Sequence, residues 1–440
     1  MRKKWTVGFI LLVILAGGIV WAQGLQEPLT LEESIKIALE RNLRLHSAVV
    51  GVVGSEYRRK EAVTNFLPLW TGQYYHTRYN SPTVVGSSGV YSPTGRLLNT
   101  DRDVFNLSTS VQQSIFAGGS IYSNYRLEKF GVDISKTDVE TVRRDIVLQV
   151  REGYFNILTA QKFLDVAKQA VKQFEAQLEV SKAFFEVGII PKNDLLQSEV
   201  RLANAKQALV RAENNLALAK SSFNILLRRE INEPLEVVDI LGYKPSTLRL
   251  EESLEEALSQ RPEIKSAGLK VDQAKEGVKI ARSGFFPSIS LSGNYGRTSN
   301  EFDLGGDFKS ERWTIQTLAT LTIFDWGKTA YKVGENKVKV AQAEDLKIQL
   351  IEGVILEVKQ DYLNMQTAEK NIGVAEKAVE QAEENLRMNE ERYKYQVATA
   401  TDVLDAVTLL AQARVNYYGA LSDFNVARAR LERAMGRMYP

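Results

Sequence analysis

Two long stretches of the chain, about 117–187 and about 326–395, carry apolar residues at helical spacing. No proline falls between 94 and 190 or between 288 and 439, so nothing there interrupts a helix. At 1.5 Å per residue, each helix would be roughly 105 Å long. Helices of this length cannot be buried in a globule, so we expect them to pack lengthwise against the shorter return helices that follow and against other chains. In the first stretch, the coiled-coil-like seam consists of Val139, Val142, Ile146, Val150, Tyr154, Ile157, Leu164, Ala167, Val171, Phe174 and Leu178.

Shorter segments of the chain alternate between apolar and polar residues, which is typical of β-strands. We expect strands at about 69–80, 104–116, 288–297 and 313–324, although the first alternates poorly and is identified by its aromatic residues. The polar positions are mostly uncharged Ser, Thr, Asn and Gln, as on the wall of a water-filled lumen, and the strand lengths suit a tilted bilayer crossing. An ordinary antiparallel sheet with one solvated face remains an alternative. The aromatic residues expected at the membrane interface are Trp70, Tyr74, Tyr75, Phe105, Tyr295, Trp313 and Trp326.

A single chain cannot close a barrel from these strands, because the practical minimum is about eight. An open edge would leave backbone N–H and C=O groups unpaired in lipid. The membrane interpretation therefore requires homo-oligomerisation, in which two copies would supply eight strands and three copies would supply twelve.

The sequence contains one plan twice. LTLEESIKIAL at 29–39 matches LRLEESLEEAL at 248–258, and VREGYFNILTAQK at 150–162 matches VKQDYLNMQTAEK at 358–370. The offset falls from 219 to 208 between these matches, and we assign the additional residues of the first half to the Gly/Ser/Pro-rich stretch 81–100, a loop by composition. A repeat of this length indicates a tandem duplication and not a solenoid of short units.

The amino terminus has the features of a secretory signal peptide. Arg2, Lys3 and Lys4 precede an uncharged apolar run from Trp5 to Ala22. A retained membrane anchor is the alternative, because the run approaches the roughly 20 residues that span a bilayer. The predicted organisation is a signal peptide (1–22), a first repeat (23–247) with a helical hairpin at about 117–228 and an equatorial linker (229–247), and a second repeat (248–440) with a hairpin at about 326–436.

Composition argues against an enzyme. The chain has no cysteine and only two histidines, so it lacks disulfides, thiolate metal sites, cysteine nucleophiles and a cysteine for amino-terminal lipidation. Its 56 basic and 54 acidic residues give no basic footprint for nucleic acid. We find no phosphate-binding glycine loop, no metal-ligand spacing and no catalytic constellation, and therefore expect no cofactor.

Several short motifs occur in order, most of them in both halves. They are the duplicated LxLxE starts, Arg261-Pro262-Glu263, the junctions Phe66–Pro68 and Phe285–Pro287, the returns Ile115-Phe116-Ala117-Gly118-Gly119 and Ile323-Phe324-Asp325-Trp326-Gly327, and the turns around Val187-Gly188-Ile189 and Thr401-Asp402-Val403-Leu404. Together they make the chain resemble the TolC-type outer-membrane efflux proteins over nearly all of its mature length.

The resemblance implies a mainly α protein with membrane β-structure. A homotrimer would form a 12-stranded transmembrane β-barrel, continued by a 12-helix periplasmic α-barrel with a mixed equatorial domain. It would stand in outer-membrane lipid as the exit duct of a tripartite efflux or type I secretion system. Its partners would be a periplasmic adaptor (membrane fusion protein) and an inner-membrane transporter of the RND, ABC or MFS type. An exported structural coiled-coil or adhesin-like protein is the alternative, and it would leave the strand pairs unexplained.

The resemblance also implies two functional regions on the helical hairpins. The turns would dock the adaptor through Val187, Gly188, Ile189, Leu195, Val397 and Leu404, although ordinary turn chemistry also explains several of these residues. Gln396 stands where the family usually has glycine, which makes the second turn the less certain contact. A gate formed by Glu179 and Arg387 is possible, and a solvated charged face is the alternative.

Overall fold

The computed structural model describes residues 28–84, 100–305 and 309–438. The predicted signal peptide and positions 85–99 of the predicted loop lie outside the described residues. The first repeat comprises α1 (Leu31–Arg41), α2 (Leu43–Thr64), β1 (Leu69–Val84), β2 (Thr100–Ala117), α3 (Ser120–Glu186) and α4 (Lys192–Leu226). The second comprises α5 (Leu250–Gln260), α6 (Pro262–Arg282), the 3₁₀ turn η1 (Ser283–Phe285), β3 (Ser288–Ser299), β4 (Lys309–Thr320), α7 (Lys328–Lys394) and α8 (Ala400–Ala434).

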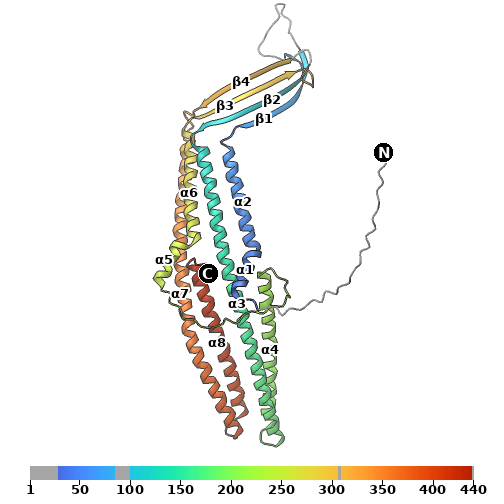
Figure 1. The fold of residues 1–440 in the computed structure, drawn as a ribbon, viewed down its shortest axis with the longest axis vertical. Coiled ribbons are helices and arrows are strands. Elements are labelled where there is room, and N and C mark those ends of the chain that lie inside the picture. Colours follow the sequence, from blue (N-terminus) through green and yellow to red (C-terminus); the bar gives the residue numbers. More distant parts are fainter. Residues whose placement is uncertain (1–27, 85–99, 306–308, 439–440) are drawn as a thin grey trace, which may run out of the picture.

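The helices form one elongated row (Figure 1). The sheet lies at one end of the row, and the turns that connect α3 to α4 and α7 to α8 lie at the other. The long helices α3 and α7 have 67 residues each, which corresponds to about 100 Å. α3 packs against α2 and α6 in the half nearer the sheet and against α4 and α8 in the other half. The row therefore has two continuous helices, and shorter helices fill the remaining places.

The apolar seam of α3 is the centre of the core. Nine of its eleven predicted positions are buried, and the other two, Val142 and Ala167, are half-buried. Tyr154 is fully buried, and its hydroxyl donates to the carbonyl oxygens of Leu29 (3.0 Å) and Val238 (2.8 Å). Burial raises the pKa of Tyr154 to about 12. This side chain therefore ties the segment between the repeats to the long helix.

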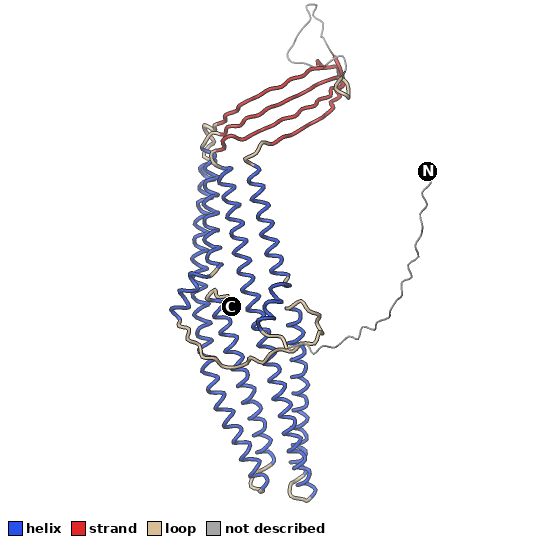
Figure 2. The backbone as a smooth tube through the Cα atoms, viewed as in Figure 1, coloured by secondary structure: helices blue, strands red, loops and turns tan. Residues whose placement is uncertain are grey.

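The segment 229–249 runs across the helix row at mid-height (Figure 2). It pairs with the start of the described chain, where the Leu29 N–H donates to Glu236 O (2.9 Å) and the Val238 N–H donates to Leu29 O (3.1 Å). At the same height α1 gives way to α2 at Asn42, and α5 gives way to α6 at Pro262. The linker thus crosses the wall where the shorter helices are interrupted.

The sheet is antiparallel, and its strand order is β1-β2-β3-β4. Its predicted fourth strand is wrong at both ends, because β4 begins at Lys309 and stops at Thr320. Thr320 pairs with Ser288, the first residue of β3, and the preceding Pro287 has no N–H to continue the ladder. The apolar positions Leu321 and Ile323 therefore belong to the strand-to-helix connection.

Two adjacent glycines in the connection between β2 and α3 allow a mutational test in which one serves as the control for the other. Gly118 and Gly119 both have positive φ, but a Cβ on Gly118 would lie 2.5 Å from the Ser283 carbonyl oxygen, whereas a Cβ on Gly119 meets nothing within 4 Å. We expect G119A to cost about 1 kcal/mol of unfolding free energy from its left-handed backbone alone. G118A adds a backbone clash and should cost about 3 kcal/mol. Urea unfolding in detergent measures both, and equal losses would contradict this account.

Candidate functional site

The described residues offer surfaces and not a catalytic centre. In the portion of the chain that the structure describes, no group of His, Asp and Glu side chains is placed to hold a metal ion. Nor does any of the described helices combine the length and apolar character needed to cross a membrane. The features to consider are the two faces of the sheet, the helical wall and the turns at its far end.

The two faces of the sheet differ in chemistry. Directly paired residues share a face, so the pairs Tyr74–Leu107 and Tyr295–Trp313 define one side. This apolar face carries Trp70, Tyr74, Phe105, Leu107, Val111, Leu291, Tyr295, Trp313 and Ile315. The opposite face carries Asn106, Ser108, Ser110, Gln112, Ser290, Ser292, Asn294, Thr298, Thr314 and Gln316. The register also puts Arg297 and Glu311 on the apolar face and Arg312 on the polar face, toward the end of the sheet far from the helices. A sheet with one mainly aromatic face and one mainly neutral polar face can separate lipid from water.

One predicted interface residue, Tyr75, lies on the polar face, because it pairs with Asn106. Its neighbour Tyr74 lies on the apolar face, since successive strand residues point to opposite sides. Trp326 lies beyond the sheet in the connection to α7, where its side chain is 85% exposed and its ring packs edge-on against Phe324. The Asp325 carboxylate fixes this connection by accepting hydrogen bonds from the backbone N–H groups of Gly327 (3.1 Å) and Thr329 (2.8 Å).

The turn between α3 and α4, which we call the first turn, presents apolar side chains at the end of the molecule. Val187 is 69% exposed, Ile189 is also exposed, and Gly188 allows the turn with φ +75°. Leu195, one helical turn into α4, is half-buried and packs on the core between the hairpins. Three of the four predicted positions at this turn are therefore accessible.

At the second turn, Val397 is 66% exposed and so can be reached by a partner, whereas Leu404 is fully buried, which contradicts its predicted place on the docking surface. Leu404 packs with Val403 and Val407 on the inner side of α8, so it is not available to a partner. Tyr395 is 77% exposed but was not among the predicted docking residues, although the repeat offset of 208 makes it the equivalent of Val187. This turn therefore also ends in exposed apolar side chains.

Local hydrogen bonds hold the second turn. Gln396 adopts φ +59°, the left-handed conformation that Gly188 has in the first turn. Thr399 and Asp402 form a capping box at the start of α8, in which the Asp402 carboxylate accepts from the Thr399 N–H (2.8 Å). This bond holds the pKa of Asp402 below its usual value. The departure from glycine at position 396 therefore leaves the turn geometry intact.

The structure does not bring the predicted gate residues together. Glu179 pairs with Lys182 (2.9 Å) and Arg387 pairs with Glu384 (2.7 Å), each within its own helix. No ion pair joins Glu179 to Arg387 in the described chain. A clasp between neighbouring copies stays a prediction.

A network of ion pairs joins four helices at mid-height. Arg433 on α8 contacts Asp145 on α3 (2.7 Å), Glu263 on α6 (3.1 Å) and Glu357 on α7 (3.0 Å). Arg261 contacts the same Glu263 (3.0 Å) and Glu357 (2.5 Å). In the sequence, Arg261 and Glu263 stand out only as part of a motif, because nothing there relates them to Arg433 or Asp145. The network links the two repeats where α5 gives way to α6.

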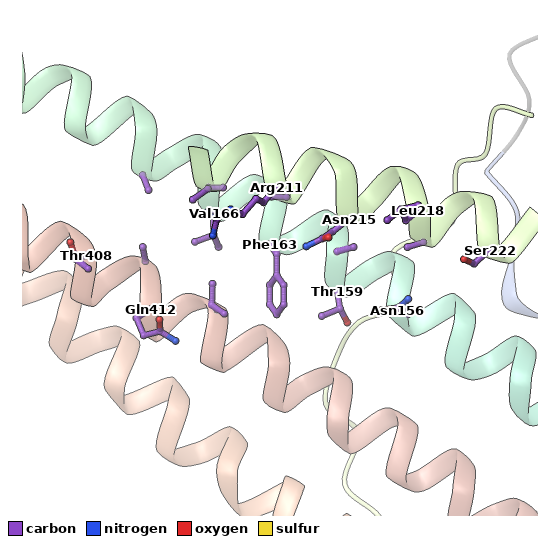
Figure 3. Close-up of a pocket in the computed structure, with 18 residues that line it drawn as sticks. Asn156, Thr159, Phe163, Val166, Arg211, Asn215, Leu218, Ser222, Thr408 and Gln412 are labelled. Carbon is purple, nitrogen blue, oxygen red and sulfur yellow. The ribbon is translucent and has the colours of Figure 1, made fainter. Parts of the chain in front are cut away.

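A groove of about 680 Å³ lies between α3, α4 and α8 on the turn side of this network (Figure 3). Its lining is mostly alanine and neutral polar side chains, with Arg211 as the one charged residue. Phe163 on α3 points into it. Phe163 follows Tyr154 by about two and a half helical turns, so the groove lies on the opposite side of α3 from the linker. The two sides of the helix wall are therefore distinct.

The comparisons with known proteins decide the family. The family described as "Outer membrane efflux protein" matches residues 34–224 and 253–437, which includes most of both repeats. The chain belongs to this family. It is an outer-membrane channel protein of the efflux and secretion type, and not an enzyme.

Individual relatives of this outer membrane efflux protein agree with that assignment. It is similar to "Outer membrane protein TolC" of Vibrio cholerae, with 25% identity over 77% of this chain and 78% of the relative. It is also similar to "Probable efflux pump outer membrane protein TtgC" of Pseudomonas putida, with 23% identity over 94% of this chain and 84% of the relative. Among solved structures, the Campylobacter jejuni CmeC outer membrane channel has the same fold, with a TM-score of 0.80, 21% identity and coverage of 92% of this chain and 85% of that one.

The network predicts a pH dependence at Asp361 on α7. Burial, followed by the nearby Glu357 carboxylate, raises the pKa of Asp361 to about 6. Because the folded-state pKa lies above the unfolded one, ionised Asp361 destabilises the fold above pH 6, and this cost disappears as the pH falls below about 4.

We expect D361N to raise the free energy of unfolding by roughly 1 kcal/mol at pH 7.5, after allowance for solvent screening of this half-buried group. The difference should vanish near pH 4. Urea unfolding in detergent at both pH values measures it, and D165N on the exposed side of α3 is the control. A D361N effect that does not change with pH would contradict the assignment.

Proposed function

We propose that three copies of this chain form one continuous duct, a 12-stranded β-barrel in the outer membrane joined to a 12-helix periplasmic tunnel. The observation that carries this proposal is that both lateral edges of the chain lack packing partners, in the sheet and in the helix row alike. Its sheet ends in two unpaired strands, and its helix row ends in two exposed apolar stripes.

The sheet supports closure by identical copies. β1 and β4 are its edges, and each has a neighbour on one side only. The amphipathic faces support a position of both edges at bilayer depth, where unpaired backbone groups would cost several kcal/mol each. Pairing β4 of one copy with β1 of the next removes both edges, and three copies then give twelve strands.

The helices support the same closure. On α4 an exposed apolar stripe lies opposite the side that packs on α3, and it consists of Leu196, Val200, Val210 and Ile225. On α7 a second stripe lies opposite the side that packs on α6 and α8, and it consists of Tyr331, Val338, Leu356, Leu363, Val374 and Met388. α4 and α7 stand at opposite ends of the lower row, so the two stripes would meet between neighbouring copies.

This assembly assigns the two sides of the wall. The linker 229–249 would form an equatorial girdle outside the tunnel, because it crosses one face of the row without entering it. The groove around Phe163 would then face the lumen, where its small and neutral side chains leave a passage for cargo. The polar face of the sheet continues this lining into the membrane.

Proteins of this family work with an adaptor and an inner-membrane pump. We infer that the adaptor meets the exposed turns, where Val187, Gly188, Ile189, Tyr395 and Val397 form an apolar rim. Cargo would pass from a pump of the RND, ABC or MFS type through the adaptor into the tunnel. A carboxylate–guanidinium contact between Glu179 and Arg387 of adjacent copies would narrow the tunnel near this rim.

The stripe on α7 gives a direct test of assembly. L356E places a charge in the middle of the stripe and should convert a particle of three chain masses into single chains, because each assembly would bury three unpaired carboxylates. E344K changes charge at an exposed position of the same helix, about 120° around the axis from Leu356, and should leave the assembly intact. Light scattering of the detergent-purified protein measures the mass, and an intact L356E trimer would contradict the interface.

The turns give a test of docking. I189D should abolish adaptor-dependent export while leaving the trimer mass unchanged, because it charges an apolar contact without touching the subunit interface. S259D adds the same charge at an exposed position on α5, away from the turns and from both stripes, and should export normally. Normal export by I189D would show that this turn does not carry the contact.

A further inference from the structure

A second groove, of about 360 Å³, lies between α6 and α7 near the point where both helices join the sheet. We call it the α6–α7 basic groove. Four of its six lining residues are cations, over an apolar floor: Lys275, Lys279, Arg282 and Lys337, with Val278 and Val340. The second repeat thus concentrates positive charge directly below the sheet.

Part of this charge has no counter-charge. Lys275 pairs with Asp272 (3.8 Å) and Lys279 pairs with Glu276 (3.0 Å). Within the described ranges, Arg282 and Lys337 form no ion pair with a carboxylate. Two converging cations without a carboxylate partner are a recognition element for an anion.

The groove faces the outside of the proposed tunnel. About nine helical turns separate Lys337 from Glu369, so both lie on the same side of α7. Glu369 accepts a hydrogen bond from the hydroxyl of Tyr243 in the linker (2.6 Å). Because the linker crosses the outer side of the wall in the proposed assembly, Lys337 also points outward.

The groove also lies at the depth of lipid headgroups. The 12 residues of β3, tilted as barrel strands are, span about 28 Å, close to the roughly 30 Å hydrocarbon thickness. The exposed Phe285 and Phe286 then stand at the interface, and Arg282 follows immediately toward the periplasm. Lys337 lies about 14 Å from the start of α7 at Lys328 and lines the end of the groove farther from the sheet.

The groove is not a general consequence of the duplicated fold. By the offsets of 219 and 208, the first repeat has Glu56 and Val63 in place of Lys275 and Arg282, whereas Lys60 and Lys129 correspond to Lys279 and Lys337. The first repeat therefore keeps two of the four cations and places an anion beside them, so the cluster of four cations belongs to the second repeat.

We propose that the α6–α7 basic groove binds the phosphodiester headgroup of an anionic phospholipid in the periplasmic leaflet of the outer membrane. The Arg282 guanidinium provides a planar fork for two phosphate oxygens, and the lysine ammonium groups add point charges around it. The acyl chains extend past Phe285 and Phe286 along the apolar face of the sheet. The inference rests on the proposed insertion of that sheet in the membrane.

Native mass spectrometry of the detergent-purified full chain tests the site by titration with three probes: dioleoylphosphatidylglycerol, dioleoylphosphatidylcholine and free glycerol 1-phosphate. The variant K275Q/K279Q/R282Q/K337Q removes the groove's charges. The variant K265Q/K359Q/K370Q/K377Q removes four exposed charges from the same two helices farther from the sheet. R282Q/K337Q removes only the two cations without a carboxylate partner, and it decides the result should the fourfold variant fail to fold.

We expect the wild type and the distant variant to bind phosphatidylglycerol about tenfold more tightly than phosphatidylcholine. The groove variants should bind the two lipids within about twofold of each other. If the wild type has the mass of three chains but binds both lipids equally, the lipid site is overturned and the proposed assembly is not. If the same spectra show only the mass of a single chain, the assembly itself is overturned. Displacement of phosphatidylglycerol by equimolar glycerol 1-phosphate would show a free-anion site and also overturn the proposal.

Discussion

The unpaired edges of β1 and β4 are the constraint on which the architecture depends. In hydrocarbon, a backbone N–H or C=O group has no water to bind, so an open four-stranded sheet is unstable there. In the proposed assembly, closure by identical copies would supply the missing partners and impose one symmetry on the whole molecule. The helices that continue from the strands would follow that symmetry, which would explain why α4 and α7 carry apolar stripes at opposite ends of the row.

A wall only one helix thick also needs stiffness along its length. α3 and α7 run uninterrupted, whereas the shorter helices break at Asn42 and Pro262. The ion pairs of Arg433 lie beside the second break and join four helices from both repeats. Tyr154 binds the linker at the same level. Mid-height is therefore where the two repeats are fastened to each other, and the turns beyond it remain exposed for a partner.

The sequence predicted whatever depends on local periodicity. Helical spacing identified the buried seam of α3, and alternation identified both faces of the sheet. Prediction failed where a neighbour in space decides the outcome: β4 ends at Thr320 because Pro287 ends its partner, and Leu404 is buried because α8 packs on the other hairpin. Tyr75 was grouped with Tyr74 because the first strand alternates poorly. The ion-pair network was missed because residues nearly 290 positions apart meet there.

The most direct measurement of the central claim is covalent capture of the sheet closure. The chain has no cysteine, so single cysteines introduced in pairs along β1 and β4 report only on the positions chosen. Oxidation in outer-membrane vesicles should give a ladder that ends at three chain masses, with bonds that alternate along the strands as side chains do. Bonds confined to single chains, or a ladder that continues past three, would contradict a closed barrel of three copies.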